Sequence, residues 1–245
     1  MLSHPSWYLT AIPGIQAIKN KLLQASALDQ TECKQTLYDF FELHLSEGDF
    51  ALGCGWGEND GQRMPIDTVI IHHTALPPGL SAARLSAIQL TRLYAPYFAD
   101  RPEVFKHLKG QPIFSGHERK GKQVFWPYHW LIRNDGKVER LLSDSEIGWH
   151  AGNWNINCRS VTITFDNDFE NSAPSGTVLQ AAVALILNQY GQVPITRIFG
   201  HREINVKTTC PSNLFLSSAG VKGWKSELIN AIAGCRNVGG NASAN

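Results

Sequence analysis

The chain has 245 residues, of which 43% are hydrophobic and 18% are charged. This length accommodates one large domain, or one domain with a modest extension, and the apolar content excludes a chain that is disordered throughout. The 22 basic and 21 acidic residues leave a formal charge of +1, so we expect no nucleic-acid partner recruited by a bulk positive field. No apolar run approaches 18 residues, and we therefore expect no membrane span.

The cysteine count is odd, with five residues in no compact repeating pattern. A disulfide-stapled scaffold is therefore excluded, and at least one cysteine is left over for another role. The cysteines are Cys33, Cys54, Cys158, Cys210 and Cys235.

The N-terminal quarter differs in composition from the rest of the chain. Leucine and phenylalanine recur at helical spacing across residues 13–46, with Asp29 or Thr31 as the expected cap between two helices. The glycine-rich stretch that follows predicts a join between an N-terminal helical extension, residues 1–58, and a main domain, residues 59–235. The extension either has an interaction role of its own or caps the main domain. Residues 236–245 are expected to form a disordered tail.

Short β-branched runs alternate with helical patterns through the main domain. The expected strands are 67–73, 160–165 and 195–199, with a hairpin over 124–142 that turns at Asn134-Asp-Gly136. The expected helices are 81–95, stopped by Pro96, then a buried helix at 177–190 and a last helix at 224–233. Residues 96–123 look irregular, either a lid over a binding cleft or an inserted surface loop. The fold class is therefore α/β, a central mixed β-sheet flanked by helices.

Two adjacent histidines end the first predicted strand. Neighbouring side chains on a strand point to opposite faces, so His72 and His73 cannot both serve one site. A histidine at this position either lines a site at the strand end or makes a structural hydrogen bond.

A second strand also leads into a histidine, His201, and Cys210 follows nine residues later. By itself this is a weak metal signal, because a buried inert cysteine is more common. Together, His72, His201 and Cys210 would suit a zinc ion with an open fourth position, which is typical of a catalytic site. Spacing alone does not establish that set.

Sequence blocks in a fixed order carry a more specific signal. They are VIIHHTA (69–75), YHWLIRNDG (128–136), GWHAG (148–152), NCRSVTI (157–163) and GHREI…CP (200–211). In this order they resemble the zinc-dependent N-acetylmuramoyl-L-alanine amidases, the family that includes phage T7 lysozyme-type amidases and peptidoglycan recognition proteins. The resemblance extends over about residues 66–215.

The resemblance implies a role for each matching residue. The zinc ligands fall on His72, His201 and Cys210, which turns His73 away from the metal toward packing or a supporting hydrogen bond. The remaining matches are Tyr128 as the catalytic tyrosine, and His150 and Asn157 as substrate-binding residues. The alternatives are a core tyrosine with a satisfied hydroxyl and two residues that hold local turns.

The chain also departs from the family pattern at several positions. The place two residues before the cysteine ligand, often Lys or Thr, is Thr208, with Lys207 beside it, so either is the expected oxyanion donor. Thr164 stands where some relatives carry a glutamate, and Ser212 replaces the glycine that often follows Cys-Pro. A glutamate base at position 164 is therefore absent.

The expected function is zinc-dependent hydrolysis of the amide bond between N-acetylmuramic acid and L-alanine, in peptidoglycan or muropeptides. The alternative is a non-catalytic recognition module, although such members typically lack the cysteine ligand that is present here as Cys210. The first residues have neither a basic opening nor a continuous apolar segment, so we expect no secretory signal. Location is then cytoplasmic, or the protein is released or exported by a non-classical route.

Overall fold

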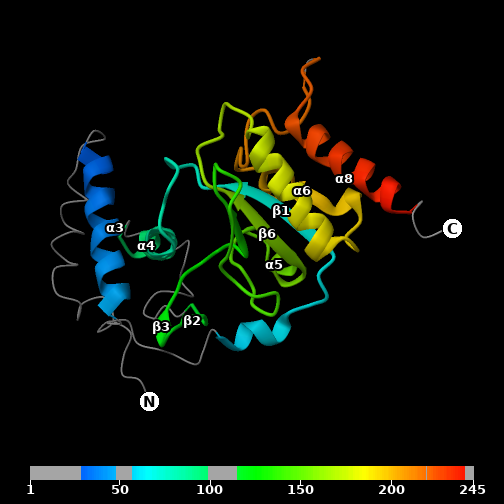
Figure 1. The fold of residues 1–245 in the computed structure, drawn as a ribbon. Helices are drawn as coiled ribbons and strands as arrows, with labels where there is room; N and C mark the ends of the chain where they lie inside the picture. The colour runs from blue at the N-terminus through cyan, green and yellow to red at the C-terminus, as the bar shows by residue number, and fades with distance from the viewer. Residues whose placement is uncertain (1–28, 48–56, 99–114, 219, 241–245) are drawn as a thin grey trace. The chain divides into compact units, whose positions relative to one another are not determined.

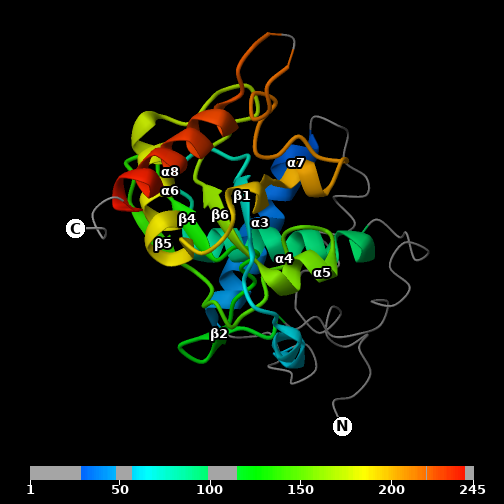
Figure 2. The same cartoon turned by 90° about the vertical axis from the view of Figure 1, so that its right-hand side faces the viewer.

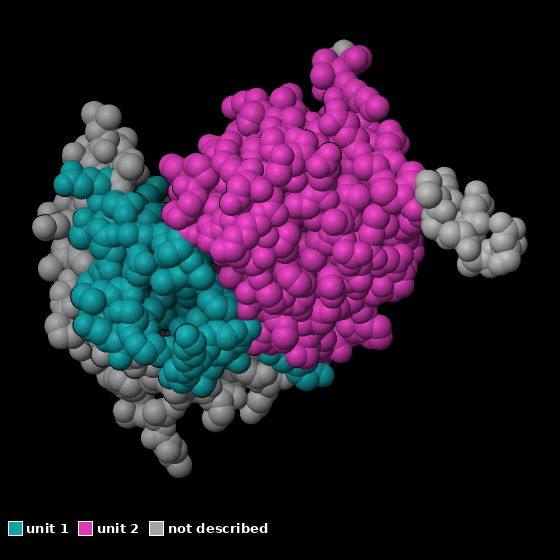
Figure 3. Space-filling view, in the orientation of Figure 1, with its two compact units in different colours: residues 1–61, 81–126 teal, residues 62–80, 127–245 magenta. Residues whose placement is uncertain are grey.

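The computed structural model describes residues 29–47, 57–98, 115–218 and 220–240. The predicted helix over 13–28, most of the predicted join and residues 99–114 lie outside this range. The chain divides into two compact units (Figure 3), residues 1–61 with 81–126, and residues 62–80 with 127–245.

A five-stranded mixed sheet forms the centre of the second unit, with strand order β5-β4-β6-β1-β7 (Figure 1). Strand β1 pairs in parallel with β6 and β7, β4 pairs in parallel with β6, and β4 and β5 are antiparallel. The strand bounds are β1 Thr68–His73, β4 Trp130–Ile132, β5 Val138–Arg140, β6 Ser160–Phe165 and β7 Ile198–Gly200. The predicted α/β class with a central mixed sheet is confirmed.

One face of this sheet forms the hydrophobic core of the unit. Helices α6 (Gly176–Tyr190) and α8 (Trp224–Gly240) lie together over that face (Figures 1 and 2). The core side chains include Val69, Ile71, Val161, Ile163 and Phe165 from the strands, and Val178, Ile186, Leu228 and Ile232 from the helices. Each large apolar side chain buried here contributes about 1.5–3 kcal/mol.

The opposite face of the sheet is buried but polar. Strand β6 reads Ser-Val-Thr-Ile-Thr-Phe, so its alternate residues Ser160, Thr162 and Thr164 turn away from the core. Thr164 pairs with His72 in the parallel register, which places both on the same face. All of these residues are at most 2% exposed. The sheet thus has an apolar core face and a second face on which its buried polar side chains are concentrated.

The predicted hairpin is present but shorter than expected, since β4 begins at Trp130 rather than near residue 124. The turn is closed by hydrogen bonds from the Gly136 N–H to the Arg133 carbonyl (2.9 Å) and from the Arg133 N–H to the Lys137 carbonyl (2.9 Å). Gly136 has φ +85°, a conformation that favours glycine. This confirms the turn predicted from the Asp-Gly pair.

Within the first unit, helices α3 (Asp29–Glu47) and α4 (Ala82–Phe98) pack together. Arg84 pairs with Asp39 (2.5 Å) and Glu42 (2.9 Å) across them. This unit therefore combines the N-terminal segment with residues 81–126. The division differs from the predicted boundary at residue 58, because a unit built from two separate stretches leaves no single junction in the sequence.

Two predictions in this unit are wrong. Helix α4 continues two residues past Pro96, since a proline in the last turn removes only one hydrogen bond near the helix end. The stretch called irregular holds a small antiparallel hairpin, β2 (Glu118–Arg119) with β3 (Lys122–Gln123). Lys120 and Gly121 make its turn with φ of 54° and 73°, and strands of two residues are too short for a periodic signal.

Several short elements were not predicted or have different bounds. These are the helical turns η1 (Gly57–Gln62), α5 (Trp154–Arg159), η2 (Ile195–Arg197) and α7 (His201–Ile204). The predicted strand from residue 195 begins only at Ile198, because Pro194 starts a helical turn closed by the Arg197 N–H to its carbonyl (2.8 Å). Helix α8 extends to Gly240 rather than Ala233, so the start of the expected tail is helical. None of the described helices is long and apolar enough to cross a membrane.

Candidate metal centre

His72, His201 and Cys210 converge at one end of the sheet. Their potential ligand atoms lie within 4.8 Å of one another. The Cys210 Sγ is 3.5 Å from the His72 Nδ1, and the rings of His72 and His201 have centroids 4.4 Å apart. Zn–S and Zn–N bonds of about 2.3 and 2.0 Å at a tetrahedral angle would separate sulfur from nitrogen by about 3.5 Å. The observed 3.5 Å separation therefore fits coordination of one ion.

His201 and Cys210 are tied together through the backbone. The Arg202 N–H, next to the first of these residues, donates to the Cys210 carbonyl (2.7 Å), and the Cys210 N–H donates to the Thr208 Oγ1 (3.1 Å). His201 begins α7 directly after Gly200, where an added Cβ would lie 2.4 Å from the Phe215 ring. A larger residue would displace the turn that presents the histidine.

The protonation of His201 is set by its surroundings. The imidazole hydrogen-bonds to the backbone of Ala151, and burial lowers its pKa. Its Nε2 is buried without a hydrogen-bond partner among the described residues. The Ala151 bond therefore uses Nδ1–H, which leaves the lone pair of Nε2 for a metal ion. Histidine ligands typically donate their second ring N–H to a backbone carbonyl or carboxylate in this way.

Tyr128 and His150 border the same three residues. Their ring centroids lie 5.3 Å and 5.4 Å from that of His72. The His150 Nε2 is 3.1 Å from the Ser160 Oγ, while its Nδ1 is buried without a hydrogen-bond partner in the described part of the chain. Burial holds the pKa of His150 well below its usual value, and electrostatic interactions with His129, His201 and Arg63 lower it further. His150 is therefore neutral at pH 7.

Three further residues were predicted to act in the site: Asn157, Thr208 and Lys207. The Asn157 Oδ1 accepts the Ala151 N–H (2.9 Å), so this side chain holds the loop that carries His150. Thr208 is used as the acceptor for the Cys210 N–H, and the Lys207 side chain is exposed. Their predicted substrate and oxyanion roles remain predictions.

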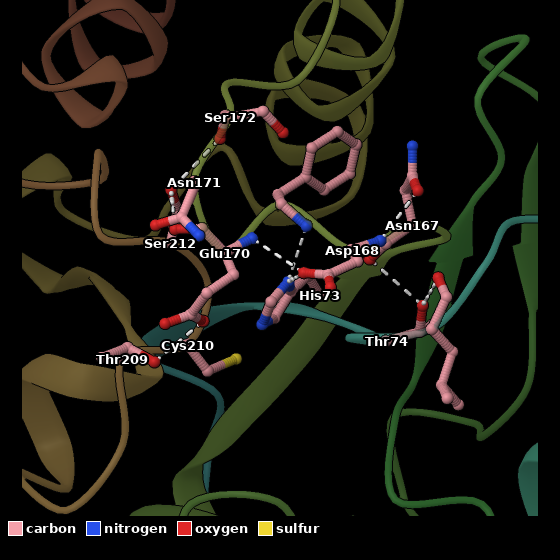
Figure 4. Close-up of polar contacts among 12 residues, drawn as sticks. His73, Thr74, Asn167, Asp168, Glu170, Asn171, Ser172, Thr209, Cys210 and Ser212 are labelled. Carbon is pink, nitrogen blue, oxygen red and sulfur yellow. Dashed lines mark hydrogen bonds and ion pairs between the residues drawn. The ribbon is translucent and has the colours of Figure 1, made fainter.

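His73 points to the other face of β1, as alternation requires. Its Nδ1 accepts the Phe169 N–H (3.0 Å) and lies 3.8 Å from the Asp168 carboxylate (Figure 4). The prediction that His73 turns away from the metal toward a supporting hydrogen bond is confirmed.

Sequence reasoning missed two residues that organise this region. His129 accepts the Thr162 N–H at Nδ1 (3.2 Å), and its Nε2 is 2.9 Å from the Glu146 carbonyl; burial lowers its pKa to about 3. Arg63 donates through Nη1 to the carbonyls of Asn157 (3.0 Å) and Ser160 (2.9 Å). The Tyr-His pair offered a signal for His129, whereas nothing local marks an arginine that binds backbone carbonyls.

Together the fold and the site define a class: an α/β protein whose mixed sheet presents two imidazoles and one thiol as a candidate metal centre. A family model described as N-acetylmuramoyl-L-alanine amidase (Amidase_2) matches residues 62–213. The chain therefore belongs to this amidase family, which confirms the predicted resemblance.

The chain is similar in sequence to peptidoglycan-recognition proteins. Peptidoglycan-recognition protein 1 of Holotrichia diomphalia is 29% identical over 162 residues, which is 63% of this chain and 70% of that protein. Peptidoglycan-recognition protein SD of Drosophila simulans is 27% identical over 175 residues, 70% of this chain and 82% of that protein. Among solved structures, the N-acetylmuramoyl-L-alanine amidase LysC of Clostridium intestinale URNW aligns with a TM-score of 0.42 and 19% identity, over 71% of this chain and 87% of that chain.

Proposed function

We propose that this protein is a zinc-dependent hydrolase of the amide bond between N-acetylmuramic acid and L-alanine in peptidoglycan or muropeptides. The observation that carries the proposal is the convergence of His72, His201 and Cys210, with the sulfur and nitrogen spaced as a tetrahedral ion requires. Imidazole nitrogen and thiolate sulfur are both zinc donors, and three protein ligands leave the fourth position of the ion for water or substrate, as in catalytic sites.

The environment of the candidate ligands also supports zinc binding. His201 is held in the tautomer that presents Nε2 to a metal, and burial disfavours its protonation. When bound, zinc supplies a Lewis acid and lowers the pKa of a coordinated water to about 7. In the reaction, the oxygen of a water molecule adds to the carbonyl carbon of the lactyl group and the C–N bond breaks. A proton from that water goes to the leaving nitrogen, which becomes the free amino group of L-alanine.

The chain's own residues then position substrate and water. Tyr128 lies beside His72. Its hydroxyl either orients the attacking water or donates a hydrogen bond to the developing oxyanion. The neutral His150 lines the same site and keeps Nδ1 for a hydrogen bond to the substrate. Thr208 already accepts the Cys210 N–H, so its own hydroxyl proton can serve as the oxyanion donor, and Lys207 is the other candidate.

The alternative function is recognition of peptidoglycan without catalysis, as the names of the recognition-protein relatives suggest. Cys210 favours the enzyme, because a recognition surface has no need of a thiol 3.5 Å from a buried imidazole.

Product analysis separates these two functions. Purified protein is assayed for zinc and then incubated with intact sacculi or soluble muropeptides, with and without a chelator, and the products are identified by mass spectrometry. We expect release of free stem peptides that stops on chelation and is absent in Cys210→Ser. Binding of either substrate by zinc-loaded protein without release of peptide would overturn the proposal and support recognition. The substrate that is cleaved shows whether the enzyme acts on intact wall or on soluble fragments.

A further inference from the structure

The loop between β6 and α6, residues 167–172, contacts both segments that carry metal-type ligands (Figure 4). One segment is the end of β1, with His72, and the other is the stretch around Cys210. Figure 4 shows the loop side chains between them. No residue of this loop belongs to the donor set.

The first set of contacts joins the loop to β1. The Phe169 N–H donates to the His73 Nδ1 (3.0 Å), immediately after His72 in the chain. The Thr74 Oγ1 donates to the Asn167 carbonyl (3.2 Å). Since His73 and Thr74 directly follow the first ligand, the loop is fixed relative to the strand that presents it.

The second set joins the loop to the Cys210 segment, and Glu170 is its centre. The Glu170 carboxylate accepts the Thr209 hydroxyl at Oε2 (2.9 Å) and the Asn213 side-chain amide at Oε1 (3.1 Å). The Glu170 carbonyl also accepts the Asn213 backbone N–H (2.8 Å). One glutamate therefore holds the chain just before and just after Cys210.

Hydrogen bonds within the loop fix its conformation, so the loop can hold the Cys210 segment in place relative to β1. The Glu170 N–H donates to the Asp168 Oδ1 (2.9 Å), and the Asp168 N–H donates to the Asn167 Oδ1 (2.8 Å). The Phe169 ring is buried in the core, edge-on to Phe165 with centroids 6.3 Å apart. A loop anchored in the core spans from one ligand segment to the other.

We infer that Glu170 is a positioning residue for the metal centre, which sets the place of the Cys210 thiolate relative to His72 and so the affinity for zinc. The inference rests on the proposed zinc site. Charged hydrogen bonds are stronger than neutral ones, and the two that Glu170 accepts are made to residues on either side of the ligand. Loss of a group bonded directly to a ligand typically weakens metal binding by about 10- to 100-fold. Glu170 acts through the neighbouring Thr209 and Asn213, so we expect the lower end of that range.

Zinc affinity, measured on the full chain by competition with a chelator, tests this role apart from catalysis. Glu170→Ala should weaken zinc binding by about tenfold, the lower end of the range for groups that support metal ligands. Thr209→Val, which keeps the side-chain shape but removes the donor, should weaken it less, and Thr209→Ser should restore it. Glu227→Ala, at an exposed glutamate of α8, is the matched control and should bind zinc as the wild type does.

A second readout distinguishes positioning from general support of the fold. In the cobalt-substituted protein, Thr209→Val should change the thiolate-to-metal charge-transfer band, while the metal-free melting temperature stays near that of the wild type. The inference is overturned if Glu170→Ala and Thr209→Val bind zinc as tightly as wild type. It is equally overturned if Thr209→Val lowers only the metal-free melting temperature. Wild-type protein that binds zinc but hydrolyses no substrate would refute the proposed function while leaving the positioning role to these measurements.

Discussion

Replacing Asn157 with alanine tests how the loop around His150 supports the candidate metal ligand His201. The Asn157 Oδ1 accepts the Ala151 N–H at 2.9 Å, and the backbone of Ala151 in turn hydrogen-bonds to the His201 imidazole. Asn157 thus acts on a candidate ligand through a single residue, Ala151, which it holds by its N–H. The same residue was predicted from the sequence to bind substrate, and the two roles give different results.

The magnitude follows from the burial of the bond. Asn157 is 5% exposed and Ala151 is 0% exposed, so water cannot replace the lost acceptor. A buried N–H left without a partner costs about 1–3 kcal/mol. At about 2–4 °C per kcal/mol for a chain of this size, the metal-free melting temperature should fall by about 2–12 °C. Zinc affinity should fall by about tenfold, since the bond that orients His201 loses its support.

Melting curves in the presence of a chelator, zinc competition and steady-state kinetics together provide the assay. Asn155→Ala is the control, because this exposed asparagine lies in the same short helix, α5. An Asn157→Ala protein with wild-type melting temperature and zinc affinity but a raised KM would refute the loop-support reasoning. It would instead favour the predicted contact with substrate.

Three further predictions concern the site and its surroundings. Cys210→Ser should lose zinc and all turnover, as metal analysis and peptide release will show; retention of both would refute the ligand set. Tyr128→Phe should keep zinc but reduce kcat by about 100- to 1,000-fold, the usual loss for one oxyanion donor, and an unchanged kcat would remove Tyr128 from the mechanism. Acid should destabilise the metal-free protein through His129, whose pKa of about 3 in the fold lies below the 6.5 of the unfolded chain. The unfolded chain therefore binds a proton that the folded protein does not, and the free energy of unfolding falls as pH drops from 6.5 toward 3, by about 2.5 kcal/mol between pH 7 and 4.5. Denaturant titrations of His129→Gln should show a flatter pH dependence.

The sheet could be predicted from the sequence because its strands carry local signals. Strand β6 occupies the predicted residues 160–165, and the Asp-Gly turn identified the β4–β5 hairpin. Helix α6 begins at Gly176, where Ser175 caps it by accepting the Val178 N–H. In each case residue type and spacing within a short window determine the structure.

The parts that escaped prediction are held by contacts between distant residues. Helices α5 and α7 have six and four residues, too few for a periodic pattern, and α7 is fixed by the Arg202–Cys210 backbone bond. The role of Glu170 depends on Thr209 and Asn213, which lie about 40 positions away in the sequence. The sequence around a glutamate in a polar loop does not indicate that its carboxylate binds residues so far away in the chain.

The paired histidines His72 and His73 lie on opposite faces of the sheet and have different roles. His72 faces the polar side with Thr164, whereas His73 shares the other side with the core and binds the loop that carries Glu170. A slip of β1 by one residue would exchange these faces, and pairing with β6 on one side and β7 on the other fixes the register. His73 therefore supports the site from behind the sheet: it holds the 167–172 loop, and that loop holds the segment of Cys210. The second histidine of the motif is thus a structural partner of the first and not a spare ligand.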